Sequence, residues 1–281
     1  MIIGAHVSIS GGIHNAVLNA QTLGCETFQI FTKNQNQWQE KQYKSEEILK
    51  FHEALHNSDQ NPAQLAAHDS YLINLCAAES EKLKKSRQAF LNEIQRCTDL
   101  KIPYIIFHPG SHMGKGEEWG LQLISESLQW AIEESSGSPV MLLLETTAGQ
   151  GTNLGYQIEQ LKIIMNNVNI PKRLGICLDT CHIFAAGYDI SDQKSYDRTF
   201  AHIIDEIGIT NIAAFHLNDS KRKLGSRVDR HEVIGAGYIG EYAFRRMMND
   251  GRFMDLPGFL EIPGGEGAFK ECLIRLKSYR E

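Results

Sequence analysis

The sequence predicts an α/β fold of the TIM-barrel type, in which eight parallel strands are surrounded by helices. Short apolar runs recur along the chain, and most of them end at a His, Asp or Glu. Successive run ends lie roughly 25 to 45 residues apart, which leaves room for a strand, a loop and a helix each time. Eight runs of this kind are present, and eight is the number of strands that closes this barrel.

We expect the strands, in chain order, at residues 1–5, 27–31, 64–67, 104–107, 141–144, 175–178, 212–215 and 258–260. Continuous apolar runs of this length are typical of parallel strands that are buried on both faces. Between them, apolar residues repeat at helical spacing, as at Phe90, Ile94 and Cys97, and we expect these helices to pack on the outside of the barrel. The 281 residues are close to the roughly 250 of one such barrel, so we expect a single domain spanning residues 1–281.

The sequence predicts a cytoplasmic protein that has no membrane association, and a monomer because no exposed heptad repeat or second domain is evident. The sequence has no basic leader followed by a long apolar stretch, and no apolar run long enough to span a bilayer. The six cysteines form no CxxC pair, which favours reduced thiols in the core over disulfides. Cys177 and Cys181 flank Asp179, but Cys177 is expected to face the barrel interior, so thiolate ligation of a metal is disfavoured.

Nine His, Asp and Glu residues lie at or just beyond the ends of the apolar runs: His68, His108, Glu145, Asp179, His182, His216, Asp229, His231 and Glu261. A single His at a strand end is more often a hydrogen-bonded structural residue than a ligand. The carboxyl ends of all eight strands converge on one face of a barrel, however, so several such residues indicate a shared site. Imidazole combined with carboxylate suits zinc, with Mn²⁺ or Fe²⁺ as alternatives at one position. The sequence therefore predicts a polynuclear metal site on the barrel rim.

A second metal motif, the HExxH pattern at His52 and His56, competes with this interpretation. On a helix it would place two imidazoles one turn apart beside a possible general base. The same helix would bury Ile48, Phe51 and Leu55, which leaves both histidines on the flank of an outer helix, and we favour that solvated position. His6 and His112 are expected to orient ligands or touch substrate rather than bind metal.

Several motifs occur in a fixed order along nearly the whole chain: GAHVS at 4–8, FTKNQ at 31–35, HDSYLINL at 68–75, FHPGSH at 107–112, TAGQG at 147–151, LDTCH at 178–182, HLND at 216–219 and GSRVDRH at 225–231. On these motifs the chain resembles the endonuclease IV family of apurinic/apyrimidinic (AP) endonucleases. The sequence departs from the family pattern at Thr146, where Asn is expected, and at Ile262, where Thr is expected.

The resemblance implies three Zn²⁺ ions that share the nine residues. The implied groups are His68, His108 and Glu145 for one ion; Glu145, Asp179, His216 and Glu261 for a second; and His182, Asp229 and His231 for a third. Glu145 would bridge two metals and orient or deprotonate the attacking water, which makes it the expected catalytic residue. Closely spaced metals suit phosphodiester hydrolysis because they stabilise both the attacking and the leaving oxygen.

The implied partner is duplex DNA that contains abasic sites or blocked 3′ ends. The net charge of −6 does not exclude it, because four of the acidic residues are proposed metal ligands. The run Lys221, Arg222, Lys223, Arg227 and Arg230 is expected to position phosphates. The resemblance implies that Tyr71 and Leu72, and the loop presenting residues 33–37, enter the minor groove. Family members can carry Arg where this chain has Asn36, so the groove contact at Asn36 differs.

Together these features predict a zinc-dependent deoxyribonuclease of base excision repair. It would cut on the 5′ side of an abasic site, leave a 3′-hydroxyl and trim blocked 3′ ends. Two alternatives stay open. One is a divalent-metal sugar isomerase or epimerase of related barrel fold, against which the extra set of His182, Asp229 and His231 argues. The other is a non-catalytic, metal-stabilised module that binds damaged DNA.

Overall fold

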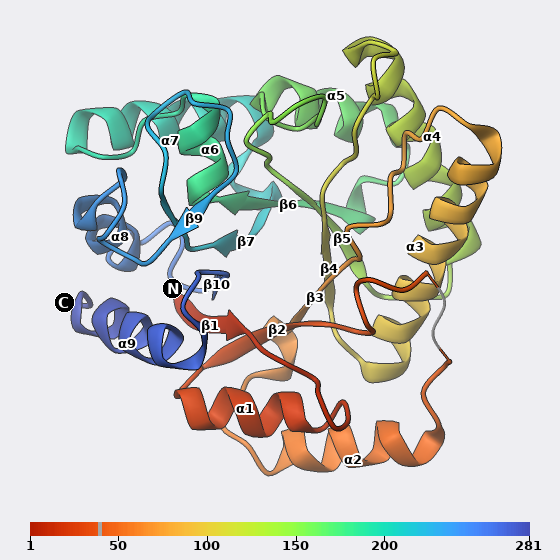
Figure 1. Ribbon diagram of the computed structural model, residues 1–281, viewed down its shortest axis with the longest axis horizontal. Coiled ribbons are helices and arrows are strands. Elements are labelled where there is room, and N and C mark those ends of the chain that lie inside the picture. Colours follow the sequence, from red (N-terminus) through yellow and green to blue (C-terminus); the bar gives the residue numbers. More distant parts are fainter. Residues whose placement is uncertain (39–40) are drawn as a thin grey trace.

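The computed structural model describes residues 1–38 and 41–281, and within them the strands close into a parallel barrel (Figure 1). Going round the barrel, the strand order is β1-β10-β7-β6-β5-β4-β3-β2. The strands are β1 (Ile2–His6), β2 (Thr27–Phe31), β3 (Ala66–His68), β4 (Tyr104–Phe107), β5 (Met141–Glu145), β6 (Leu174–Asp179), β7 (Ile212–His216) and β10 (Pro257–Leu260). The predicted fold class is confirmed, and each predicted strand lies within two residues of an observed one.

Helices surround the barrel, and most of them bury one apolar face against the strands (Figure 1). They are α1 (Asn15–Leu23), α2 (Ser45–His56), α3 (Ser80–Leu100), α4 (Glu117–Glu134), α5 (Ile158–Asn167), α6 (Thr180–Ala186), α7 (Gln193–Ile207), α8 (Glu241–Met248) and α9 (Gly265–Ser278). Short 3₁₀ turns precede three strands, at η1 (Pro62–Gln64), η2 (Pro171–Arg173) and η3 (Ile209–Asn211). None of the helices in the described residues is long and apolar enough to cross a bilayer.

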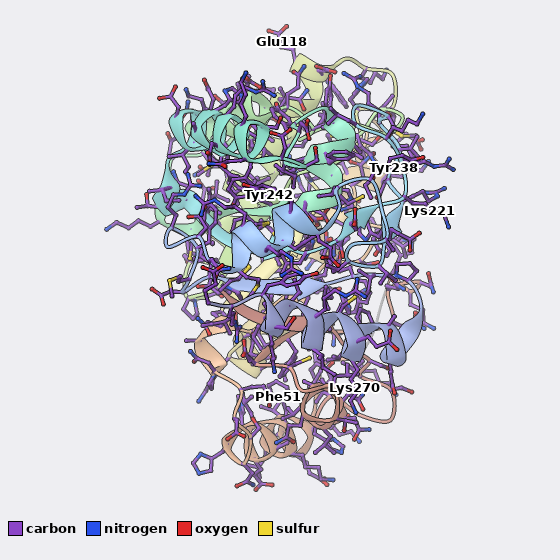
Figure 2. The ribbon with its side chains drawn as sticks, turned by 90° about the vertical axis from the view of Figure 1, so that its left-hand side faces the viewer. Phe51, Glu118, Lys221, Tyr238, Tyr242 and Lys270 are labelled. Carbon is purple, nitrogen blue, oxygen red and sulfur yellow. The ribbon has the colours of Figure 1, made fainter. Side chains whose placement is uncertain are left out.

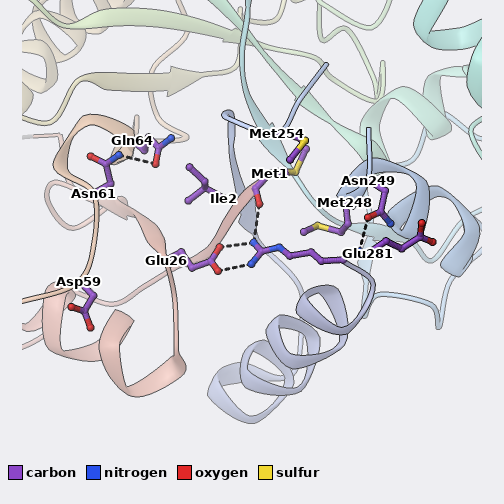
Figure 3. Close-up of a pocket in the computed structure, with 11 residues that line it drawn as sticks. Met1, Ile2, Glu26, Asp59, Asn61, Gln64, Met248, Asn249, Met254 and Glu281 are labelled. Carbon is purple, nitrogen blue, oxygen red and sulfur yellow. Dashed lines mark hydrogen bonds and ion pairs between the residues drawn. The ribbon is translucent and has the colours of Figure 1, made fainter. Parts of the chain in front are cut away.

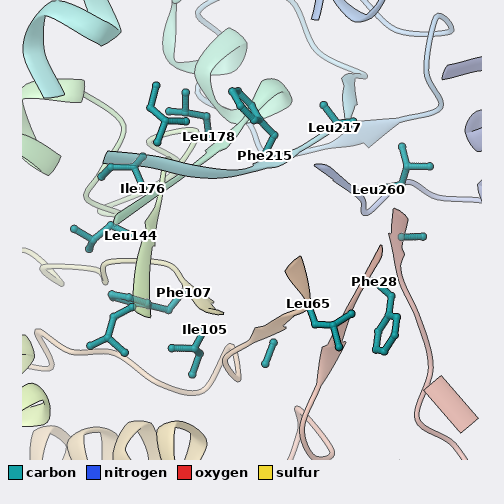
Figure 4. Close-up of a cluster of buried hydrophobic side chains, with 14 of the residues drawn as sticks. Phe28, Leu65, Ile105, Phe107, Leu144, Ile176, Leu178, Phe215, Leu217 and Leu260 are labelled. Carbon is teal, nitrogen blue, oxygen red and sulfur yellow. The ribbon is translucent and has the colours of Figure 1, made fainter. Parts of the chain in front are cut away.

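Alternation along each strand divides the core into two parts. A small cluster fills the barrel interior with one residue from each of six strands: Ala66, Ile106, Leu143, Cys177, Ala214 and Phe259. Their chain neighbours, such as Ile105 and Phe107 on β4 or Leu144 on β5, belong to the larger cluster between the strands and the helices (Figure 4). Cys177 thus lies in the barrel interior, as predicted.

The sequence did not predict the antiparallel ribbon of β8 (Asp219–Ser220) and β9 (His231–Glu232), nor the short helix α6 directly after β6. The ribbon pairs Ser220 with His231 and so closes the basic loop between them into a hairpin. Both elements lie at the carboxyl ends of the strands. They carry the residues that the barrel strands alone do not supply to the site described below.

The opposite end of the barrel is fastened by an ion pair that links both chain termini (Figure 3). The Arg280 guanidinium donates two hydrogen bonds of 2.6 Å to the Glu26 carboxylate and one of 2.8 Å to the Met1 carbonyl. The Ile3 amide donates to the same carboxylate at 2.9 Å. Glu26 follows α1, so one side chain connects the start of β1 to the end of the chain.

Candidate metal centre

Six of the nine predicted ligands follow directly from strand geometry. Each lies two residues after one of the six barrel-interior residues, and alternation therefore points it along the barrel axis at the carboxyl end. These six residues are His68, His108, Glu145, Asp179, His216 and Glu261. The other three come from the two unpredicted elements: His182 from the first turn of α6, and Asp229 and His231 from the hairpin loop and β9.

The structure brings the nine residues into three groups, in each of which one ligand atom per residue lies within 4.8 Å of the others. The groups are His68, His108 and Glu145; Glu145, Asp179, His216 and Glu261; and His182, Asp229 and His231. They have the same membership as the three sets that the family resemblance implies. Such a convergence of imidazole and carboxylate is what a zinc-type polynuclear site requires.

Glu145 lies at the centre of this arrangement and is fully buried. Its Oε2 atom is 2.9 Å from His68 Nε2 and 3.3 Å from His108 Nε2. Its Oε1 atom is 3.0 Å from His216 Nδ1 and 3.1 Å from His182 Nδ1. One carboxylate therefore faces four imidazoles, which is the position expected of a residue that bridges two metals.

The hydrogen bonds on the outer side of the rings show that these residues fit a cation. A backbone carbonyl oxygen faces Nδ1 of three rings: Asp69 O at His68 (2.9 Å), Thr146 O at His182 (2.8 Å) and Glu261 O at His231 (2.9 Å). Because a carbonyl only accepts, Nδ1 carries the proton and the lone pair of a neutral ring lies on Nε2. Those Nε2 atoms point into the site, and outer-side partners of this kind are typical of metal-binding histidines.

The third group shows this fit most clearly. His182 Nε2 and His231 Nε2 are only 3.4 Å apart, and the Asp229 carboxylate is 3.2 Å from the first and 3.5 Å from the second. Two lone pairs and a carboxylate that converge without a proton between them repel one another. A divalent cation at this point would satisfy all three groups.

Electrostatics in the site favours ionised carboxylates. Burial alone would raise the pKa of Glu145, but the charges of His216 and His108 hold it well below its usual range. For His68, burial would lower the pKa, yet the hydrogen bond and charge of Glu145 raise it to about 9. Without metal, protons on the imidazoles would therefore balance the buried carboxylates, and metal binding would replace those protons.

Two residues that hold the ligands in place were missed at the sequence level. Gln29, in the barrel interior on β2, donates to Glu261 Oε1 at 2.6 Å and accepts from His216 Nε2 at 2.8 Å. Asn218 donates to Asp179 Oδ2 at 2.7 Å and accepts from the Glu261 amide at 2.8 Å. The sequence does carry a signal for Gln29, because it is the one amide side chain in the strand TFQIF and interrupts the apolar residues Phe28, Ile30 and Phe31.

The two departures from the family pattern, Thr146 and Ile262, both lie behind the predicted ligands or in the core. Thr146 accepts a hydrogen bond from the Asp179 amide at 2.9 Å through its hydroxyl, and its carbonyl orients His182. It therefore supports two predicted ligands from behind. Ile262 is buried and joins the large hydrophobic core. Neither residue displaces a member of the three groups.

The hairpin loop that carries Asp229 and His231 is fixed at its base by Asp219. This fully buried carboxylate accepts hydrogen bonds from four backbone amides, those of Ser220, Gly235, Gly237 and Ile239. Gly237 is needed at this point, because a Cβ atom there would lie 2.4 Å from both Asp219 Oδ1 and the Ser220 carbonyl oxygen. Asp219 thus closes both ends of the loop onto the barrel.

The competing HExxH motif is not part of any metal-capable group among the described residues. It lies on α2, which buries Phe51 and Leu55 as predicted, while Ile48 is half-buried. His56 is exposed as predicted, whereas His52 is half-buried and its Nε2 atom is inaccessible to solvent. His6 contacts Glu261 Oε1 at 3.2 Å, in keeping with an orienting role, whereas His112 accepts from the Gly116 amide at 3.1 Å. Cys181 does lie near Asp179 and His231, but burial raises the pKa of its thiol to about 12, which disfavours the thiolate in the absence of metal.

Most of the predicted DNA-contacting side chains are accessible on this face. Tyr71 is 63% exposed and lies against Phe31 and the rings of His68 and His108. Leu72 beside it is half-buried, and Asn36 is exposed. Lys33 was expected to be presented with residues 34–37, and this prediction is wrong. Its side chain is only 6% exposed because it turns inward to a buried carboxylate.

The basic residues of the hairpin loop point outward. Lys221, Arg227 and Arg230 are exposed, and Figure 2 shows Lys221 reaching out at the same edge of the molecule as Tyr238. The Arg227 guanidinium lies 4.4 Å from the centre of the Tyr156 ring. Stacking of this kind fixes the direction of an arginine while leaving its donors free for a phosphate.

Comparison with known proteins first defines the structural class of this protein. A family model described as "Xylose isomerase-like TIM barrel" matches residues 17–279. A D-tagatose 3-epimerase-like protein shares the fold at a TM-score of 0.77, covering 99% of this chain and 97% of that chain. At 17% identity that likeness shows the fold alone.

Two closer matches narrow the class. The chain is 48% identical to "Probable endonuclease 4" of Chloroflexus aurantiacus, over 94% of this chain and 92% of that protein. It also superposes on the crystal structure of endonuclease IV from Thermus thermophilus with a TM-score of 0.88 at 31% identity, covering 99% of this chain and 98% of that one. The chain belongs to the endonuclease IV family of AP endonucleases.

Proposed function

We propose that this protein is a zinc-dependent AP endonuclease of base excision repair that cuts duplex DNA on the 5′ side of an abasic site and leaves a 3′-hydroxyl. The observation that carries the proposal is the convergence of three ligand groups on one barrel rim, two of which share Glu145. Membership of the endonuclease IV family supports the same reaction. Trimming of blocked 3′ ends belongs to the proposal, because it breaks the same kind of phosphodiester bond.

The nine residues of the three groups would hold three Zn²⁺ ions, with Mn²⁺ or Fe²⁺ as an alternative at one position. When bound, such ions lower the pKa of a coordinated water from 15.7 to about 7 and neutralise charge on phosphate oxygens. Glu145 would bridge the first two groups and orient the attacking water. Because the surrounding imidazoles hold its pKa well below the usual range, Glu145 is ionised at neutral pH and suits an orienting role better than that of a strong base.

The residues around the rim would bind the DNA. Lys221, Arg227 and Arg230, which are exposed, would contact backbone phosphates without reading sequence. Tyr71 and Leu72 would insert at the damaged step, where unstacking costs least because a base is missing. Asn36 would approach the groove with an amide in place of a charged side chain, so its contact should depend little on salt.

The test is incubation of metal-loaded protein with a duplex that carries a single tetrahydrofuran abasic analogue and a label on each strand. We expect one cut on the 5′ side of the analogue, with a 3′ end that a polymerase can extend. Glu145→Ala and His182→Ala should lower the rate by more than about 100-fold, the upper range for residues that only support ligands. His52→Ala is the matched control and should cleave like wild type.

The other outcomes distinguish the alternatives. Intact DNA in the presence of metal-loaded wild-type protein would contradict the proposal, and DNA that is bound but uncut would favour the non-catalytic module. Epimerisation of a free ketose by the same preparation would favour the sugar epimerase. The monomeric state, the cytoplasmic location and the single-domain boundary at 1–281 stay predictions from the sequence.

A further inference from the structure

Residues 32–37, which follow β2, are anchored by a buried ion pair that lies outside the metal centre. The Lys33 ammonium lies 3.4 Å from Glu93 Oε1, a carboxylate on α3 that is 1% exposed. It also donates to the Gln37 carbonyl at 2.7 Å and to the Asn34 carbonyl at 3.5 Å. The Thr32 hydroxyl donates to the other oxygen of Glu93. Lys33 therefore closes residues 34–37 into a compact turn around its own charge.

Residues 41–43 are also bonded to α3. Arg96, one turn beyond Glu93 and buried, donates to the Lys41 carbonyl at 2.9 Å. The Tyr43 hydroxyl donates to the Thr32 carbonyl at 2.5 Å, which joins the end of the segment to its beginning. Two charged side chains of one helix thus hold residues 33–37 and the backbone at Lys41.

A single hydroxyl connects this loop to the next one. Ser70, which is 1% exposed, donates to the Gln35 carbonyl at 2.6 Å. Its oxygen accepts from the Leu72 amide at 3.3 Å, and its carbonyl accepts from the Ile73 amide at 2.9 Å. Ser70 therefore shapes the turn that carries Tyr71 and Leu72, and it links that turn to residues 34–37.

A buried Lys–Glu pair is poor support for stability alone, because desolvation of both charges offsets their attraction. The pair does fix the conformation of residues 33–37, because a buried charge that lost its hydrogen-bonding partners would be strongly destabilising. We propose that Lys33, Glu93 and Ser70 are positioning residues that hold the two DNA-facing loops as one preformed surface before DNA binds. This inference rests on the proposed function for the identity of the ligand. A preformed surface binds more tightly because no loop needs to be ordered on binding.

Hydrogen–deuterium exchange on the DNA-free, metal-loaded protein tests whether Lys33, Glu93 and Ser70 hold the two loops in place. Ser70→Ala removes the bond to the Gln35 carbonyl that links the loops, together with the acceptor of the Leu72 amide. Ser125→Ala is its matched control, because Ser125 is also buried and donates to the Leu121 carbonyl at 2.8 Å within α4. We expect amides of residues 34–37 to exchange about five-fold faster in Ser70→Ala, the effect of one lost hydrogen bond, and at the wild-type rate in Ser125→Ala. Lys33→Met should accelerate exchange further. Unchanged exchange in both loop variants would overturn the proposal.

Single-turnover cleavage of the abasic duplex tests whether the preformed loops strengthen DNA binding. We expect Ser70→Ala to raise the enzyme concentration for half-maximal rate about five-fold while the maximal rate stays within about two-fold of wild type. A change in the maximal rate alone, or no change in half-saturation despite faster exchange, would overturn the positioning role. Failure of wild-type protein to cleave would contradict the proposed function instead, and the exchange experiment would still decide whether the loops are held as one surface.

Discussion

The hairpin loop that supplies Asp229 and His231 depends on one buried carboxylate, and Asp219→Asn tests that dependence. Each Asp219 oxygen accepts two backbone amides: Oδ1 from Ser220 at 2.7 Å and Ile239 at 2.9 Å, and Oδ2 from Gly235 at 2.9 Å and Gly237 at 3.1 Å. Asparagine has nearly the same shape, but its NH₂ group cannot accept. Whichever way it is oriented, two amide donors would face a third donor.

The substitution therefore removes two hydrogen bonds to a charged acceptor. At about 1.5–3 kcal/mol each, their loss lowers the free energy of unfolding by about 3 kcal/mol or more. Urea unfolding of the metal-free protein measures this change. Because the loop is no longer closed at its base, we also expect the variant to retain about two thirds of the wild-type metal content after dialysis, with His182, Asp229 and His231 losing their ion.

Asp192→Asn is the matched control. Asp192 caps α7 by accepting from the Ser195 amide at 3.1 Å, and asparagine caps a helix as well as aspartate does. Its stability and metal content should equal those of wild type. If Asp219→Asn also matched wild type in both measurements, the reasoning that one carboxylate fixes the loop would be refuted.

Three further predictions concern the termini, the wedge and the metals. Glu26→Gln should lower the free energy of unfolding by about 2 kcal/mol at pH 7, because the bonds to Arg280 lose their charge. Burial would raise the pKa of Glu26, but the hydrogen bonds and charge of Arg280 outweigh burial and lower it. The greater stability of the wild type is therefore fully present above the pKa of Glu26 in the unfolded chain, about 4.3, and is lost as the pH falls through the lower pKa of the folded protein. Urea unfolding at pH 7 and pH 3 checks this, and a constant difference would contradict it. Tyr71→Ala should weaken binding of the abasic duplex by about ten-fold, as expected for one lost stacking side chain, with an unchanged Tm because the ring is exposed; equal affinity in a gel-shift titration would exclude the wedge role. Metal affinity should fall between pH 8 and pH 6, because the pKa of His68 is raised to about 9 without metal and protons compete for the site; calorimetry in two buffers should show proton release on binding, and its absence would contradict the exchange of protons for metal.

The barrel could be predicted from the sequence because buried parallel strands leave a continuous apolar signal. The six strand-borne members of the site followed from their position at the ends of those runs. The supports behind them could not be predicted in the same way. Asn218 and Thr146 each act through two hydrogen bonds to residues far away in the sequence, and no local pattern marks such contacts.

Lys33 shows a different limit of sequence-based prediction. A lysine in a polar loop is expected to be solvated, and only its pairing with Glu93, 60 positions away on α3, explains its burial. The hairpin of β8 and β9 was missed because each strand has only two residues. Tertiary contacts, chiefly those of Asp219, define these elements, and their local sequence carries little strand signal.

The most direct measurement is the metal content of the purified protein after exhaustive dialysis, determined by inductively coupled plasma mass spectrometry together with protein concentration. Three ligand groups predict close to three divalent ions per chain, with zinc the main element. Glu145→Gln should lose a marked share of them, because Glu145 belongs to two of the groups. A ratio near one ion per chain, unchanged in Glu145→Gln, would contradict a trinuclear centre.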